Sequence, residues 1–392
     1  MVGLLDRAEQ RPALTAFVVG FAARLVVVVG LGLTGSHLPD ESTFWGMAGD
    51  LLAGSTEGAG DRWHVIYSEV PFFVWPLAGI RWVAGPTVLA PRLTIAIAGA
   101  TTAALTAHGT ARATGGRSRA ALVAGLLVAL WPSQVLYSSA VLKDAVVWLA
   151  LSATFAATSH AVEVPGRRAG GTAFVVGATA VLLLSGTRAS TGVVAAIALV
   201  AALAVLPGPR RWRLLLGASA VLVLVVAPWV TGKGPAGSEV FAASTEAATA
   251  RATEGADACT TVRSVGQTRQ LDRMLVDLPR GVSLVWLEPY VWEEVCQPAG
   301  QIAKVEVVAW YGLLVAAGLA VLRRQVAWRA LVFPMVCLAG LTAAGALAEV
   351  NVGTAFRHRG ALFWAVAALA GTAVAGRRQG QSQLPRGPMG PG

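Results

Sequence analysis

Charged residues are scarce in this chain of 392 residues. They make up 13% of it, whereas soluble globular domains contain about 25%. Hydrophobic residues make up 55%, and they gather in runs of roughly 20 residues, the length that crosses a bilayer. This composition excludes a soluble enzyme, a small disulfide scaffold and a disordered chain. It predicts an all-α, polytopic membrane protein.

Cysteine and lysine are also scarce. The three cysteines show no spacing typical of metal ligands. Cys259 and Cys296 share one polar segment, so we expect a disulfide if that segment lies outside the cytoplasm; two free thiols are the alternative. Lysine fills only three of the 31 basic positions, so a lysine within a functional pattern is more informative than an arginine.

The net charge of +10 does not indicate nucleic-acid binding, because the basic residues form short clusters between apolar runs instead of one patch. Such clusters are typical of the cytoplasmic ends of membrane spans. The clusters are Arg7 and Arg11; Arg112, Arg117 and Arg119; Arg167 and Arg168; Arg210, Arg211 and Arg213; Arg323, Arg324 and Arg329; and Arg377 and Arg378.

The apolar runs predict ten membrane-spanning helices. They lie at about 13–35, 88–110, 119–138, 143–160, 171–186, 190–207, 213–231, 304–322, 328–348 and 359–376. A further run at about 70–85 is short and contains two prolines. Basic connections alternate with non-basic ones along the chain only if this run does not cross the membrane. We therefore predict a re-entrant or interfacial helix at 70–85 and a plasma-membrane protein with both termini in the cytoplasm.

This topology divides the chain into four parts. Residues 1–231 form a transmembrane module that includes the first outer loop, 36–87. Residues 232–303 form an extracytoplasmic loop with an amphipathic helix, since Leu271, Met274, Leu275 and Leu278 have helical spacing. Residues 304–378 hold the last membrane helices. Residues 379–392 are rich in Gly, Pro and Gln, and we expect them to be a disordered cytoplasmic tail.

Ionisable residues at membrane edges are costly and often functional, and most of those here fall on the predicted outer side. Asp40 and Glu41 follow the first span; they are either a helix N-terminal cap or a catalytic base or metal ligand. Eight more residues have two interpretations. In the simpler one they are loop charges, salt bridges or snorkelling side chains, and in the functional one they bind substrate or take part in catalysis. These are His64, Glu69, Tyr137, Lys143, Asp144, Arg188, Arg357 and Arg359.

Acids in the first outer loop and cations in later outer turns suit a phosphate-bearing lipid at the outer leaflet. Arginine binds phosphate bidentately, and a carboxylate can take a proton from an acceptor hydroxyl. A polyprenyl phosphate leaves as a stable anion, which nearby cations stabilise further.

Three stretches resemble motifs of the C-type (GT-C) polytopic glycosyltransferases, which include protein O-mannosyltransferases and aminoarabinose transferases. They are Asp40-Glu41-x-x-Phe44, the Pro-containing helix from Pro71, and the segment from Pro132 to Asp144. The resemblance covers about residues 13–210. One departure is Glu69 before Pro71, where the family has a lysine.

The resemblance implies an inverting transfer of a sugar from a polyprenyl-phosphate donor to an extracytoplasmic glycan, lipid or protein acceptor. Asp40 would be the base or would help to hold a divalent metal ion, Glu41 would support it, and Asp144 would be the second acid. Lys143, Arg188, Arg357 and Arg359 would face the donor phosphate, and Glu69, Tyr137 and His64 would lie with them around the substrate.

Three other functions fit the composition. A polysaccharide polymerase or ligase would depend on arginines in 232–303 and 349–359 instead of Asp40 and Glu41. A transporter of lipid-linked sugars would need a polar pathway through the spans. A structural partner in an envelope-assembly complex would need none of the outer acids.

Overall fold

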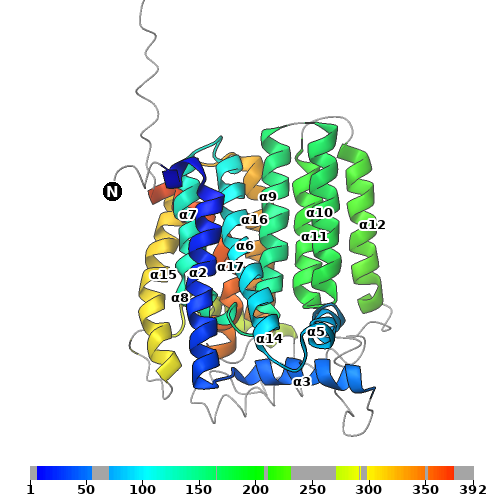
Figure 1. Cartoon of the computed structure of the whole chain (residues 1–392). Helices are drawn as coiled ribbons and strands as arrows, with labels where there is room; N and C mark the ends of the chain where they lie inside the picture. Colours follow the sequence, from blue (N-terminus) through cyan, green and yellow to red (C-terminus); the bar gives the residue numbers. More distant parts are fainter. Residues whose placement is uncertain are drawn as a thin grey trace, which may run out of the picture.

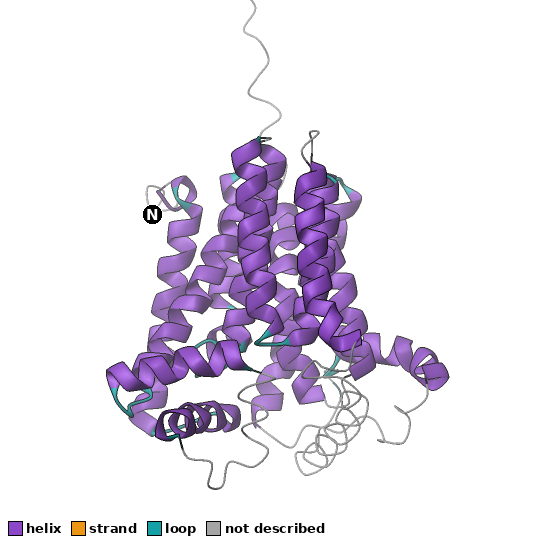
Figure 2. Ribbon diagram, turned by 90° about the vertical axis from the view of Figure 1, so that its right-hand side faces the viewer, coloured by secondary structure: helices purple, strands orange, loops and turns teal. Residues whose placement is uncertain are grey.

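The computed structural model describes residues 7–54, 70–164, 166–206, 211–230, 271–290, 292, 298–348 and 352–374, and these residues form helices joined by turns and loops, with no strand among them. Its helices are α2 (Pro12–Thr34), α3 (Pro39–Ala53), α5 (Pro71–Ala84), α6 (Leu89–Ala113), α7 (Ser118–Leu130), α8 (Pro132–Tyr137), α9 (Asp144–Glu163), α10 (Arg167–Ser185), α11 (Ala189–Ala204), α12 (Arg211–Val230), α14 (Leu271–Leu287), α15 (Pro298–Leu322), α16 (Trp328–Ala348) and α17 (Val352–Val374). Figures 1 and 2 show a bundle of long helices. The predicted all-α fold class is confirmed.

Among the described residues, six helices are long and apolar enough to cross a membrane. They are Pro12–Thr34, Leu89–Ala113, Asp144–Glu163, Arg168–Ser185, Ala303–Leu322 and Trp328–Leu347. Two more, Ser118–Leu130 and Ala189–Ala204, are apolar but shorter. The described part of the chain therefore has the helices of a membrane-embedded protein.

The run at 70–85 forms α5, which has 14 residues and is about 21 Å long at 1.5 Å per residue. This is shorter than the roughly 30 Å hydrocarbon core of a bilayer. Figures 1 and 2 show α3 and α5 lying across one end of the bundle instead of along it. We call this end, where α3 and α5 lie, the site end.

The expected single helix at 119–138 is broken in two, which corrects that prediction. Helix α7 ends at Leu130 and α8 begins at Pro132. Proline disfavours helical geometry in the residue before it, and Trp131 is extended, with φ −64° and ψ 124°. The break leaves the last carbonyls of α7 without partners from their own helix.

Arg24 on α2 supplies those partners. Its side chain is fully buried, and it donates hydrogen bonds to the carbonyl oxygen of Ala129 (3.1 Å) and to Ser138 Oγ (2.6 Å). Gly99 makes the approach possible, because a Cβ there would overlap Ser138 Oγ and Arg24 Nε. Arg24 therefore holds the broken helix in place and does not face lipid.

Candidate active site at one end of the bundle

Four charged side chains from four separate parts of the chain meet at the site end. Asp40 lies in the first turn of α3, and Asp144 is the first residue of α9. Arg188 immediately precedes α11, and Arg357 lies on α17. Both acids stand at helix N-termini, where the helix dipole favours negative charge. We call these four residues the charge network.

Asp144 is the buried centre of the charge network. Its side chain is 0% exposed, and it pairs with two arginines. Arg188 Nη2 donates to Oδ1 at 2.7 Å, and Arg357 Nε donates to Oδ2 at 2.7 Å. A buried carboxylate is tolerated when cations and hydrogen bonds compensate for the lost water, so Asp144 fixes both guanidinium groups.

Asp40 is the accessible acid of the charge network. Its side chain is 51% exposed, and Arg357 Nη1 donates to its Oδ2. The guanidinium of Arg357 also lies 5.9 Å from the ring centroid of Tyr137. Lys143 Nζ lies 5.8 Å from the ring centroid of Phe44, one turn along α3 from Asp40. Sequence reasoning placed these residues on one side of the membrane, and the fold brings them to one end of the bundle.

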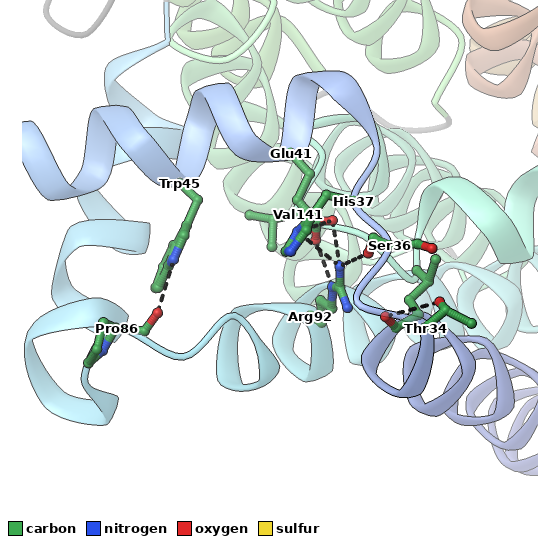
Figure 3. Close-up of polar contacts among 9 residues, drawn as sticks. Thr34, Ser36, His37, Glu41, Trp45, Pro86, Arg92 and Val141 are labelled. Atoms are coloured by element: carbon green, nitrogen blue, oxygen red, sulfur yellow. Dashed lines mark hydrogen bonds and ion pairs between the residues drawn. The ribbon is translucent and has the colours of Figure 1, made fainter.

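Glu41 forms a second, separate ion pair (Figure 3). It accepts two hydrogen bonds from Arg92, Nε to Oε1 at 2.8 Å and Nη2 to Oε2 at 2.7 Å, and both side chains are buried. The backbone N–H of Val141 donates to Oε1 at 3.0 Å. Glu41 therefore ties α3 to α6 and to the segment before Asp144, which fixes the position of Asp40 relative to Asp144.

This environment makes the stability contributed by Glu41 depend on pH. Burial alone would raise the pKa of Glu41, but hydrogen bonds from Arg92 and Val141 and the charge of Arg92 outweigh it and lower the pKa below its ordinary value. A carboxyl group with a lowered folded pKa stabilises the fold above the unfolded pKa of about 4.3. That stabilisation is lost as the pH falls through the folded pKa.

We therefore expect Glu41→Gln to melt at a lower temperature than the wild type at pH 7 and to lose less stability on acidification. The reason is that glutamine cannot pair with the charge of the buried Arg92 and does not titrate. Thermal unfolding of the purified protein in detergent, measured between about pH 7 and pH 3, tests this. Equal acid-induced losses in the two proteins would contradict it.

Arg359, predicted to face the donor phosphate, makes different contacts in the described residues. It is 4% exposed, and it donates to the carbonyl oxygens of Val285 (2.8 Å) and Glu288. Its guanidinium lies 5.5 Å from the ring centroids of Trp310 and Phe356. These bonds hold the end of α14 against α17.

Glu306 on α15 is a buried acid that sequence reasoning missed. It accepts hydrogen bonds from the backbone N–H (3.0 Å) and the hydroxyl (2.7 Å) of Ser133, and from the indole N–H of Trp131. Glu306 thus supports the start of α8, which carries Tyr137. The signal available was a single acid inside a predicted span, the type of residue that is costly in a membrane.

Several predictions concern residues outside the described part. His64, Glu69, Cys259, Cys296 and the tail at 379–392 lie there.

The sequence also suggested a divalent metal ion at Asp40 and Asp144. No group of three or more His, Cys, Asp or Glu side chains among the described residues could hold an ion. Asp40 and Asp144 are bridged by Arg357, whose positive charge lies between the two carboxylates, so these residues do not fit a metal site.

The charge network can perform two kinds of chemistry. Arg188 and Arg357 have guanidinium groups that can bind the oxygens of a phosphate. Asp40 is accessible enough to accept a proton from a hydroxyl group that arrives from solvent. Comparisons with protein-family models, curated proteins and solved structures give no match.

Proposed function

We propose that the protein is an integral plasma-membrane glycosyltransferase of the GT-C type. It would move a sugar from a polyprenyl-phosphate donor to an extracytoplasmic glycan, lipid or protein. The observation that carries the proposal is the meeting of Asp40, Asp144, Arg188 and Arg357 at one end of an apolar bundle. An accessible acid and two arginines, held together by one buried acid, are the groups that such a transfer needs.

The proposed topology has ten spans. The six helices named above account for six, and α7 with α8, α11, α12 and α17 would provide the others. Figure 1 shows that α2 begins and α17 ends at the end of the bundle opposite the site end. The basic clusters at Arg112 to Arg119 and at Arg323 to Arg329 follow helices that run toward that opposite end. Under the positive-inside rule it is cytoplasmic, and the site end faces outward.

Cysteine labelling tests this orientation. We expect a cysteine introduced at Arg117 to react with a membrane-impermeant maleimide only after the cells are permeabilised, and a cysteine at Ser36 to react in intact cells. A cysteine-free background with Cys259, Cys296 and Cys337 replaced removes competing thiols. Labelling of position 117 from outside intact cells would reverse the topology and place the charge network in the cytoplasm.

The reaction begins with an acceptor hydroxyl beside Asp40 and the donor phosphate beside Arg188 and Arg357. The hydroxyl oxygen forms a bond to the anomeric carbon as the bond from that carbon to the phosphate oxygen breaks. The hydroxyl proton goes to the Asp40 carboxylate. Polyprenyl phosphate leaves with the bonding electron pair, and the two guanidinium groups stabilise its added negative charge. A single displacement of this kind inverts the anomeric configuration.

The broken helix suits a lipid substrate. Helix α7 has 13 residues and spans about 20 Å, so α8 lies within the bundle, above the lower end of α2 in Figure 1. Six residues separate the end of α8 from Asp144, the first residue of α9. Non-helical backbone at membrane depth is tolerated where it is buried in protein or lines a cavity. A recessed site would let a phosphate approach from the outer leaflet while its prenyl chain stays in lipid.

A transfer assay tests the proposed function. Membrane vesicles that contain the protein receive polyprenyl phosphate carrying a radiolabelled sugar, and chromatography follows the label. We expect label to leave the donor and free polyprenyl phosphate to form, faster than in vesicles without the protein. Arg357→Ala should abolish the difference. If vesicles with and without the wild-type protein behave alike with a panel of donor sugars, the proposal fails.

A further inference from the structure

Arg357 contacts two carboxylates with different parts of its guanidinium group. Its Nε donates to Asp144 Oδ2 at 2.7 Å, and its Nη2 pairs with the same oxygen. Its Nη1 donates to Asp40 Oδ2. One edge of the guanidinium is thus anchored on Asp144, and the remaining nitrogen holds Asp40.

The two contacts differ in how easily they can be exchanged. Asp144 is 0% exposed and is also paired with Arg188, so breaking its contact with Arg357 would leave buried charges uncompensated. Asp40 is 51% exposed and Arg357 is 19% exposed, so water competes for the Asp40 side of this pair and weakens it relative to the buried one. The contact between Arg357 Nη1 and Asp40 is therefore the one that an arriving anion can replace.

This contact also competes with the proposed chemistry in the free protein. A carboxylate oxygen that accepts a hydrogen bond from Arg357 is less available to accept one from an acceptor hydroxyl. A base must lie within hydrogen-bond reach of the hydroxyl, about 2.6–3.2 Å. Release from Arg357 would thus leave both oxygens of Asp40 available to the acceptor hydroxyl.

We propose that the donor phosphate displaces Asp40 from Arg357, so that binding of the lipid donor frees the base. This inference rests on the proposed function and adds an order to it: the donor binds first and the acceptor second. A phosphate group presents several strong acceptor oxygens to arginine. It carries one negative charge in the donor and up to two after transfer, so the exchange also favours release of the leaving group. Before a donor arrives, Arg357 Nη1 occupies one of the two carboxylate oxygens of Asp40.

Equilibrium binding of farnesyl phosphate, a soluble prenyl monophosphate, tests the exchange. The protein is placed in phosphatidylcholine nanodiscs at constant ionic strength, and wild type is compared with Asp40→Asn. If the phosphate must compete with Asp40 for Arg357 Nη1, Asp40→Asn should bind about twofold to fivefold more tightly, the upper part of the range for a weak, exposed ion pair. Asp40→Ser is a second variant in case asparagine itself occupies Arg357.

Two further variants distinguish displacement of Asp40 by the phosphate from simple repulsion between negative charges. Asp50→Asn removes one negative charge from the same helix, α3, and should change the affinity clearly less than Asp40→Asn does. The half-buried Asp50 lies about 15 Å along α3 from Asp40, which is beyond the Debye length of about 8 Å at physiological salt. Arg357→Lys should weaken binding about tenfold or more, since lysine lacks the planar fork that meets phosphate. Size-exclusion chromatography identifies any variant that does not fold.

The outcomes distinguish this inference from the proposed function. If wild type binds farnesyl phosphate but Asp40→Asn and Asp40→Ser bind it no more tightly, the phosphate does not compete with Asp40; the exchange is wrong and the proposed function survives. If Asp50→Asn tightens binding as much as Asp40→Asn, the effect is simple charge repulsion, and the exchange is again wrong. If neither wild type nor the Asp40 variants bind, the donor site itself is wrong, and both proposals fail.

Discussion

Asp40→Asn is expected to lower the rate of sugar transfer by about 10²–10⁴, the usual contribution of general acid–base catalysis. Asparagine keeps the shape of the side chain and can still hydrogen bond to Arg357, but it cannot take up the proton of the acceptor hydroxyl. Expression and membrane insertion should be unchanged, because Asp40 is half exposed at the site end of the bundle. The transfer assay with labelled donor measures the loss directly.

The simpler interpretation of Asp40 as a helix cap gives the opposite result. Asparagine is about as good an N-terminal cap as aspartate, so a variant that lost only a cap would transfer sugar at nearly the wild-type rate. That outcome would favour a polymerase or a non-enzymatic role. Glu41→Gln is the matched comparison, because it removes the neighbouring charge. We expect it to cost stability through Arg92 and to cost less activity per folded molecule.

Asp144→Asn should have the largest effect on stability. It leaves Arg188 and Arg357 partly buried beside a neutral amide, and breaking a buried ion pair by removing one partner costs about 3–5 kcal/mol. We expect a clear fall in melting temperature in detergent. We also expect loss of transfer in the fraction that remains folded, since both arginines would lose their fixed positions.

Glu163→Gln serves as the control for Asp144→Asn. Glu163 pairs with Arg112 at 2.8 Å near the opposite end of the bundle, and the two side chains are 28% and 34% exposed. Exposed pairs contribute about 0–1 kcal/mol, so this variant should melt close to the wild type. If the two variants lost the same stability, Asp144 would not be the anchor that the geometry indicates.

The helices themselves could be predicted from the sequence because apolar length is a strong signal. Each predicted span except 119–138 corresponds to one helix, and the short run at 70–85 lies across the site end. The break between α7 and α8 was missed because the apolar pattern continues through it. Only the conformation of Trp131 before Pro132 and the hydrogen bonds from Arg24 reveal that the chain stops being helical there.

The members of the candidate site could be predicted, but their pairing could not. The predicted topology places the four residues of the charge network on one side of the membrane, because the span count and the basic clusters assign each of them to an outer connection. Asp144 and Arg357 are 213 residues apart, and no local pattern says which cation meets which acid. For the same reason, the sequence does not reveal that Glu41 pairs with Arg92 or that Arg359 donates to backbone carbonyls.

A density map of the protein in nanodiscs with farnesyl phosphate bound tests the central claim most directly. We predict that the phosphate lies at the site end with its oxygens at hydrogen-bond distance, about 2.7–3.2 Å, from the guanidinium groups of Arg357 and Arg188. Asp40 should then be turned away from Arg357 toward solvent. A phosphate bound elsewhere, with Asp40 still on Arg357, would contradict the proposed active site.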